Sequence, residues 1–242
     1  MAYGRMARPR KTAPPPPKAR PLRRVLRWAV RGVAAFAGVI VLGIVLYVLI
    51  NPPTTPYMFA EGRRLGGVDQ TWVAFEDIAP VMARSVVAAE DANFCLHWGL
   101  DIAAIRAAMG EGGNRGASTI SQQVVKNAYL WQGRSWFRKV LEAGITPLME
   151  AVWTKRRVLE VYLNIAEFDE GVFGVQAAAQ HHFGVVAADL TPRQAARLAA
   201  VLPDPKGRSA SDPSDFVRNR AAQIIDGAAT IQADGRADCF TD

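Results

Sequence analysis

A run of 19 uncharged residues, Gly32 to Ile50, constrains the fold of this chain more than any other feature. At 1.5 Å per residue, a helix of this length spans roughly 28 Å, close to the ~30 Å hydrocarbon core of a bilayer. Trp28 and Tyr47 lie near the two ends of the run, where aromatic rings favour the membrane interface. The segment therefore predicts a transmembrane helix, and the folded body has to come from the residues that follow it.

A cleaved signal peptide is the alternative for an apolar segment so close to the N-terminus. Signal peptides have an apolar region of about 7 to 15 residues, followed by a cleavage site made of small residues. The segment here is longer, and the sequence Asn51-Pro52-Pro53-Thr54-Thr55-Pro56 after it offers no such site. We therefore favour an uncleaved anchor.

The basic charge of the chain belongs to its N-terminus and not to its body. The net charge is +7, yet residues 1–31 contain ten Lys or Arg and no acidic residue, which leaves −3 for the rest. A basic tail can bind nucleic acid, but cations directly before an apolar span are better explained by membrane orientation. We expect a basic cytoplasmic tail (1–31), a transmembrane helix (32–50) and an extracytoplasmic domain (51–242), with no nucleic-acid partner.

The residues after the anchor show helical periodicity and hardly any strand pattern. Thr119-Ile120-Ser121-Gln122 matches a capping box, and Thr191-Pro192 is a typical helix start. The periodicity predicts a mostly α-helical body with helices over 78–90, 118–130, 136–152, 155–167, 171–183, 191–202 and 217–228. Pro147 is expected to kink or end the third helix. Two segments, 56–59 and 71–73, are candidates for a short strand pair.

The two cysteines, Cys95 and Cys239, do not make a disulfide framework. A single bond between them is permitted outside the cytoplasm. Two unpaired thiols are the simpler interpretation, and we expect both cysteines to be free.

A carboxylate stands directly after an apolar run, at the end of the predicted helix 78–90. Glu90 follows Val86-Val87-Ala88-Ala89 and precedes Phe94 and Trp98. Apolar surroundings disfavour the charged form of a carboxylate and raise its pKa towards the range useful for proton transfer. Taken alone, Glu at a helix end is more often solvated, so its interpretation as a base depends on the residues that follow.

Polar side chains able to hold an anion gather on the helix predicted over 118–130. Ser118 and Thr119 lie at its N-terminus, where free N–H groups and the helix dipole favour anions. A spacing of four residues places two polar pairs on shared helix faces: Gln122 with Lys126, and Gln123 with Asn127. A carboxylate base beside such a cluster suggests group transfer from a phosphorylated donor.

A third cluster, Arg138, Lys139 and Glu142, shares one face of the predicted helix 136–152. It has two interpretations. One is an ordinary surface ion pair worth roughly a few tenths of a kcal/mol. The other is a carboxylate that holds cations, or a metal ion, against a phosphate. The residues alone leave both open.

With these motifs in order, the chain resembles glycosyltransferase family 51, the peptidoglycan glycosyltransferases, and in particular its monofunctional biosynthetic transglycosylases. The resemblance covers roughly residues 56–228. It rests on five motifs: Glu90-Asp91 with Phe94, His97, Gly99 and Asp101; Gly116-Ala117-Ser118-Thr119-Ile120 with Gln122-Gln123 and Lys126-Asn127; Arg138-Lys139 with Glu142; Lys155 with Tyr162-Leu163-Asn164; and Gly171, Gly174-Val175 and Phe183-Gly184. No transpeptidase-type Ser-x-x-Lys domain follows, so we expect a monofunctional protein.

The resemblance implies a lysozyme-like helical domain that polymerises lipid II, a disaccharide-pentapeptide on undecaprenyl pyrophosphate, into glycan strands. It implies a place in the bacterial inner membrane, with the N-terminus in the cytoplasm and the domain in the periplasm. Glu90 would be the general base on the acceptor GlcNAc 4-hydroxyl, which displaces the lipid pyrophosphate of the donor with inversion. Glu142 would lie by that pyrophosphate, beside basic side chains or a divalent cation (Mg²⁺ or Mn²⁺). No organic cofactor is implied.

By the same resemblance, Lys126, Arg138 and Lys139 would stabilise the charge that develops on the leaving group. The remaining polar residues of the motifs would shape the substrate pocket: Asp91, Ser118, Thr119, Gln122, Gln123 and Asn127. Lys155 and Asn164 belong to a motif for which we expect a structural role. The implied partners are lipid II, the growing strand, the membrane, and proteins of cell-wall synthesis or division.

Four residues, at three places in the chain, depart from the pattern of the family. Ser121 stands where Thr is frequent, His181-His182 where an aromatic residue usually precedes Phe183, and Val185 where Lys is common. Adjacent histidines point to opposite sides of most backbones, so we expect no metal site at His181-His182.

Two other functions stay open at this point. A lysozyme-like hydrolase or lytic transglycosylase would explain Glu90, but it gives no role to Lys126, Arg138 and Lys139. An inactive, membrane-anchored scaffold of the wall-synthesis machinery would need neither Glu90 nor Glu142.

Overall fold

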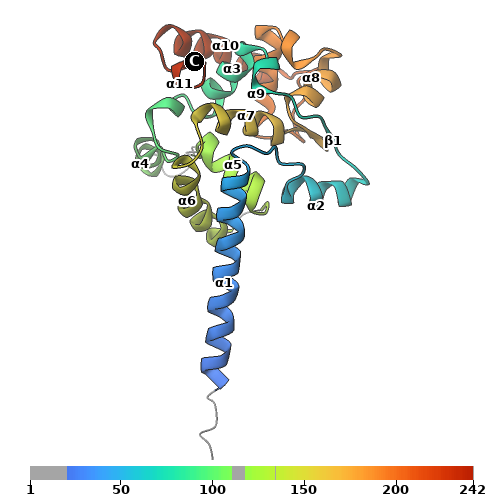
Figure 1. The fold of residues 1–242 in the computed structure, drawn as a ribbon. Coiled ribbons are helices and arrows are strands. Elements are labelled where there is room, and N and C mark those ends of the chain that lie inside the picture. The colour runs from blue at the N-terminus through green and yellow to red at the C-terminus, as the bar shows by residue number, and fades with distance from the viewer. Residues whose placement is uncertain (1–20, 111–117, 134, 242) are drawn as a thin grey trace, which may run out of the picture. The chain divides into compact units, whose positions relative to one another are not determined.

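The computed structural model describes residues 21–110, 118–133 and 135–241, in two units that meet at Leu42 and Gly43. Helix α1 (Pro21–Leu46) carries the apolar run, and its segment Arg23–Leu46, which contains an 18-residue stretch with a mean hydropathy of 2.3, is long and apolar enough to cross a membrane. This helix is the blue one in Figure 1.

The bounds of α1 differ from the predicted span 32–50 at both ends. The helix begins earlier because the arginines before the apolar run are good helix formers, whereas the prediction counted only uncharged residues. It gives way to turns after Leu46, ahead of Pro52 and Pro53, which cannot continue a helix. Most of the predicted tail, residues 1–20, lies outside the described residues, and the division into three parts stays a prediction.

The body is built mainly from helices, which confirms the predicted fold class. Its α-helices are α2 (Pro56–Leu65), α3 (Pro80–Glu90), α4 (Ile102–Gly110), α5 (Ile120–Tyr129), α6 (Trp136–Glu150), α7 (Lys155–Ile165), α8 (Val175–Phe183), α9 (Pro192–Val201), α10 (Asp215–Ala233) and α11 (Asp238–Thr241). Short 3₁₀ turns are η1 (Phe75–Asp77), η2 (Phe94–Leu96) and η3 (Ala187–Asp189). The predicted capping box at Thr119 forms, and the predicted helix start at Thr191-Pro192 is confirmed, with a capping box there as well. Pro147 lies inside α6 and does not end it.

A small three-stranded sheet replaces the strand pair that we predicted. Strands β1 (Asp69–Gln70), β2 (Glu167–Asp169) and β3 (Val172–Phe173) form it in the order β1-β3-β2, with β1 parallel and β2 antiparallel to β3. The predicted strand 56–59 is wrong, because Thr55 caps and Pro56 starts a helix there.

The predicted helices 155–167 and 171–183 ran too far, because the β2–β3 turn lies between α7 and α8. Gly174 has φ +82°, and a Cβ at that position would lie 2.8 Å from the backbone oxygen of Asn164. Only glycine therefore fits the junction between β3 and α8 without strain.

Helices α3 and α5, which carry the predicted site residues Glu90 and Lys126, are each packed against at least two other helices of the core. Helices α3, α9 and α10 pack against one another, and α5 packs against α6 and α7 (Figure 1). Val158, Leu159, Val161 and Leu163 of α7 are fully buried. Because α7 is held on several sides, it forms a rigid support under α5.

A disulfide joins Cys95 to Cys239, with the two Cα atoms 5.7 Å apart, so the expectation of free thiols is wrong. The bond ties η2, directly after Glu90-Asp91, to the C-terminal helix α11. Nearby, the Phe94 and Phe240 rings lie 6.3 Å apart. The pairing depends on a tertiary contact between segments 144 residues apart, which spacing alone cannot reveal.

Candidate active site

Glu90 is the last residue of α3, and an amide on α5 holds its side chain. The Gln123 Nε2 donates a hydrogen bond to the Glu90 Oε2 at 2.7 Å, and the Tyr162 hydroxyl donates to the Gln123 Oε1 at 3.1 Å. Tyr162 is buried on α7, so it fixes which way the Gln123 amide points.

The surroundings of Glu90 raise its pKa, as the apolar sequence before it predicted. Burial beside the core is the largest cause, because it disfavours the carboxylate form. The hydrogen bond from Gln123 and the charges of Arg220 and Lys126 act in the opposite direction. The result is a carboxyl group that binds a proton more readily than a solvated glutamate does.

Lys126 lies one turn beyond Gln123 on the same face of α5 and is half-buried. Burial lowers its pKa, while the negative charges of Glu142 and Glu90 raise it. Among the residues that the structure describes, no hydrogen bond or ion pair is formed by the Lys126 ammonium group. A half-buried cation without a partner is available to an anionic ligand.

Glu142 is only 2% exposed, which decides between the two interpretations of the third cluster. Its Oε2 accepts a hydrogen bond from the Arg138 Nη1 at 2.8 Å, and its Oε1 accepts one from the Lys139 Nζ at 2.5 Å. The Lys139 Nζ also donates to the Ser118 Oγ at 2.9 Å. The cluster is therefore a buried carboxylate that holds two cations and not an ordinary surface ion pair.

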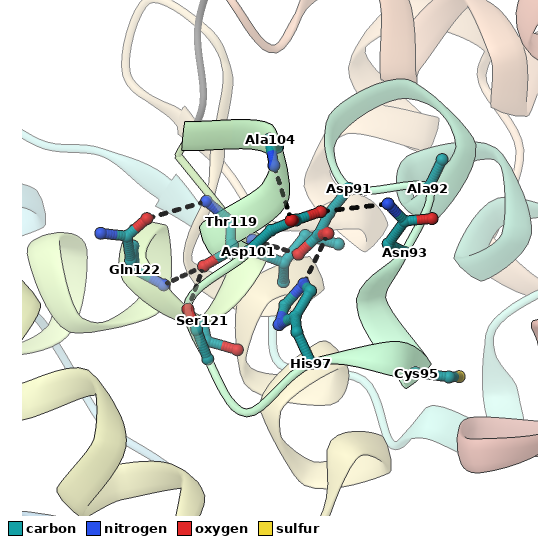
Figure 2. A network of polar contacts seen from close by, with 12 residues as sticks. Asp91, Ala92, Asn93, Cys95, His97, Asp101, Ala104, Thr119, Ser121 and Gln122 are labelled. Atoms are coloured by element: carbon teal, nitrogen blue, oxygen red, sulfur yellow. Dashed lines mark hydrogen bonds and ion pairs between the residues drawn. The ribbon is translucent and has the colours of Figure 1, made fainter. Parts of the chain in front are cut away.

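The segment 91–101, which follows Glu90, is joined to the start of α5 by a hydrogen-bond network (Figure 2). Asp91 is buried, pairs with the His97 Nε2 at 2.9 Å and accepts the Ile120 N–H at 3.0 Å. The Thr119 hydroxyl donates to the Gly99 carbonyl at 2.6 Å, and the Gln122 side chain closes the capping box. These contacts set the position of α5, and with it Gln123 and Lys126, relative to Glu90.

Two cavities contain most of the predicted site residues. One, of about 230 Å³, is lined by Glu90, Asp91, Asn93, Asp101, Ser118 and Thr119 among others. The other, of about 210 Å³, is lined among others by Tyr57, Gln123, Lys126, Asn127, Gln132 and Tyr162. The hydrogen bond between Glu90 and Gln123 joins a lining residue of the first cavity to one of the second. The motif residues Gly116 and Ala117 lie outside the described residues.

The sequence reasoning missed Glu150, a buried carboxylate on α6 that supports α5. Glu150, 6% exposed, accepts hydrogen bonds from the Ser121 hydroxyl and, at 2.8 Å, from the Lys155 Nζ. The Lys155 Nζ also lies 4.4 Å from the centre of the Phe94 ring. Ser121 and Lys155 were noted in the sequence, but Glu150 was not, because it reaches both of them through tertiary packing.

Asn164 joins two segments of backbone and does not face either cavity. Its side chain accepts the Val73 N–H at 2.8 Å and donates to the Val73 carbonyl at 3.0 Å. These contacts agree with the structural role that we expected.

Comparison with known proteins identifies the family to which this chain belongs. Residues 60–229 match the family model described as Transglycosylase. The chain belongs to this transglycosylase family. It is 64% identical over 214 residues (88% of this chain, 90% of the relative) to a biosynthetic peptidoglycan transglycosylase of Jannaschia sp. (strain CCS1).

Two further relatives carry the same description. The one from Rhodospirillum centenum is 46% identical and covers 90% of this chain and 97% of its own length. The one from Caulobacter vibrioides is 45% identical and covers 82% and 89%. The resemblance drawn from the motifs is thus confirmed, and the helical body has the lysozyme-like fold of transglycosylases.

One departure from the transglycosylase pattern has a structural consequence that we predicted wrongly. The rings of His181 and His182 do not point to opposite sides: their centres are 4.8 Å apart, and both Nε2 atoms face Asp169. The reason is that the two residues form the last turn of α8, where the chain folds back along β2.

Proposed function

We propose that this chain is a membrane-anchored peptidoglycan glycosyltransferase that polymerises lipid II into glycan strands. One observation carries the proposal: Glu90, a carboxyl whose pKa is raised by burial, is linked through Gln123 to the helix that bears the half-buried cation Lys126. Similarity over most of the chain to proteins described as biosynthetic peptidoglycan transglycosylases, at 64% and 46% identity, supports the proposal.

In the proposed reaction Glu90 removes the proton from the 4-hydroxyl of the acceptor GlcNAc. The freed oxygen attacks the anomeric carbon of the donor MurNAc, and the bond from that carbon to the lipid pyrophosphate breaks. The pyrophosphate leaves with the bonding electrons, the proton stays on Glu90, and the configuration inverts from α to β. Such a reaction needs a single base, provided that the charge of the leaving group is neutralised.

Lys126, Arg138 and Lys139 supply that neutralisation in the proposal. Glu142 holds Arg138 and Lys139 in fixed positions, so little reorganisation is needed when charge develops on the pyrophosphate. Lys126 has no carboxylate bound to it in the described part of the chain, which leaves its charge for the substrate. Ser118, Thr119, Asp91, Gln122, Gln123 and Asn127 complete the proposed pocket, several of them by fixing α5.

The predicted divalent cation does not fit the side chains around Glu142. Both carboxylate oxygens already accept hydrogen bonds from cations, and no cluster of three metal-binding side chains includes Glu142 among the described residues. Mg²⁺ and Mn²⁺ favour sites rich in oxygen ligands. An ion at this place would be held mainly by the pyrophosphate of the substrate, and we derive no step through it.

For the location, we propose an inner-membrane protein with its N-terminus in the cytoplasm and its catalytic domain in the periplasm. Two observations support this. Helix α1 is long and apolar enough to cross a bilayer and is preceded by basic residues. The Cys95–Cys239 disulfide fits an oxidising compartment such as the periplasm. Lipid II and the growing strand are the proposed partners, and binding to other cell-wall or division proteins stays a prediction.

The test is polymerisation of labelled lipid II by the detergent-solubilised protein, beside an assay of cleavage of preformed sacculi. We compare the wild type with Glu90→Gln and with Asp226→Asn, the same chemical change at an exposed position of α10. We expect glycan strands from the wild type and Asp226→Asn, none from Glu90→Gln, and no cleavage. Cleavage without polymerisation would mean a hydrolase, and equal polymerisation by Glu90→Gln would remove Glu90 as the base.

A further inference from the structure

Three metal-binding side chains meet where α8 ends beside β2, outside the proposed active site. The Nε2 atoms of His181 and His182 lie 3.3 Å and 3.7 Å from the Asp169 Oδ2. One ligand atom from each of the three residues lies within 4.8 Å of the other two. This grouping has no role in the reaction proposed above.

The backbone fixes the three residues in this arrangement. Asp169 is the last residue of β2, and its Oδ1 accepts the Glu170 N–H at 2.7 Å, which leaves the Oδ2 facing the two imidazoles. The histidines occupy the last turn of α8 before Gly184, whose φ of +67° ends the helix. The carboxylate is thus oriented by the main chain and not only by the histidines.

The spacing of the ligand atoms is close to that of a zinc site. Zn²⁺ binds imidazole nitrogen and carboxylate oxygen at about 2.0 to 2.2 Å in tetrahedral geometry, which puts ligand atoms about 3.3 Å apart. The distances of 3.3 Å and 3.7 Å to Asp169 approach this value. The third distance joins the ligand nitrogens of His181 and His182 and is at most 4.8 Å. His181 is exposed, so a small rotation of its ring can bring this distance close to about 3.3 Å.

The two imidazole nitrogens of His182 make few hydrogen bonds within the described part of the chain. Its side chain is buried, its Nδ1 has no hydrogen-bond partner in the described part of the chain, and its Nε2 lies 3.5 Å from the Phe168 carbonyl. Buried polar groups are normally hydrogen-bonded or bound to an ion. A metal ion on the Nε2 would replace the long contact with the Phe168 carbonyl by a short ligand bond, whereas the Nδ1 would stay without a partner among the described residues.

We propose that Asp169, His181 and His182 form a Zn²⁺ site, with water as the fourth ligand. Two imidazoles and one carboxylate suit zinc and related transition metals and not Mg²⁺ or Ca²⁺, which take mainly oxygen ligands. The ion would clamp α8 to β2. Glu167 on the same strand accepts a hydrogen bond from the Tyr57 hydroxyl and lines the cavity that contains Lys126.

The experiment is zinc binding to the full chain in detergent, without a histidine tag and after chelator treatment. Calorimetry with Zn²⁺ and visible absorption with Co²⁺ compare the wild type with His181→Ala and Asp169→Asn. Both residues are at least partly exposed, so these variants are expected to fold. Glu170→Gln is the matched control, because it removes the neighbouring exposed carboxylate and leaves the three ligands in place.

We expect one tight Zn²⁺ per chain in the wild type and in Glu170→Gln, with tetrahedral Co²⁺ bands. Affinity should fall at least about tenfold in His181→Ala and Asp169→Asn, and Zn²⁺ should raise the apparent Tm of the wild type but not of His181→Ala. Zinc binding of equal affinity in His181→Ala, or no stoichiometric binding by the wild type, would overturn the proposal. The affinity of an ion bound near Glu142 would be the same in the wild type, His181→Ala and Asp169→Asn, which would distinguish it from an ion at the proposed site.

Discussion

At the scale of single residues, the site depends on two groups whose burial opposes their charge. Glu90 and Lys126 both lie against the core, and burial shifts the pKa of each towards its neutral form. Burial of this kind costs stability and is retained at functional sites. The raised pKa of Glu90 serves proton transfer, whereas at Lys126 a bound anion would offset the effect of burial on the charged form.

Replacing Lys126 by Ala should lower the polymerisation rate by about 10²- to 10³-fold, the usual effect of removing one group that stabilises developing charge. Arg193→Ala, which removes an exposed cation from the start of α9, is the control and should leave the rate unchanged. Initial rates with labelled lipid II give the measurement. A Lys126→Ala protein that is folded and as fast as the wild type would exclude the proposed role.

Glu90→Gln should stabilise the folded protein at neutral pH while it abolishes activity. Because burial raises the pKa of Glu90 in the folded state, the carboxyl contributes stability at low pH and loses it as the pH rises through the folded-state pKa. The neutral amide avoids this loss. Thermal unfolding in detergent should show a higher apparent Tm for Glu90→Gln at pH 7, with a difference that shrinks in acid. A lower Tm at pH 7 would contradict the burial argument.

Local signals identified some roles but not the residues that support them. A carboxylate after an apolar run predicted a raised pKa at Glu90, and the structure bears this out. Glu150 and Tyr162 could not be found in the same way, since each reaches α5 from another helix. Adjacent histidines were expected to diverge, and only the fold at the end of α8 shows that they converge.

At the scale of elements, the sequence predicted helices well where a start signal was present. Thr119 forms the capping box that its spacing indicated, and Thr191 caps the helix that starts at Pro192, as predicted. The same kind of signal at Thr55-Pro56 was overlooked, which turned a helix into a predicted strand. The β2–β3 turn was missed because its strands are two and three residues long, too short for an alternating pattern.

The disulfide holds the segment that follows Glu90 to helix α11, so its removal should destabilise the body. A Cys95→Ser/Cys239→Ser protein should lose roughly 2 to 5 kcal/mol of unfolding free energy, because the bond closes a long loop. The expected fall in apparent Tm is of the order of 5 to 15 °C. Reductant should lower the Tm of the wild type in the same direction and leave that of the variant unchanged. An unchanged Tm in both cases would show that α11 is held by packing alone.

At the scale of the whole molecule, an apolar helix and an oxidised cysteine pair agree with one topology. The helix α1 fits a bilayer, and the disulfide of the body fits the oxidising side. Neither cysteine precedes Glu90 in the sequence, so both belong to the part that carries the proposed chemistry.

In cells, the protein should stay with membranes after alkaline extraction, and a thiol-reactive polymer should label neither cysteine. After reduction and unfolding, two labels should add per chain, since the sequence contains two cysteines. Gel shifts give the measurement. Labelling of both cysteines without reductant would contradict the proposed periplasmic location of the body.

The proposed base is tested most directly by the pH dependence of kcat/KM for lipid II polymerisation. The wild-type rate should fall in acid with a midpoint above the ordinary glutamate pKa of about 4.3, because burial raises the pKa of Glu90. In Gln123→Leu the midpoint should move to still higher pH, because the hydrogen bond from Gln123 lowers that pKa. A midpoint at or below 4.3 that does not respond to Gln123→Leu would show that Glu90 is not the base.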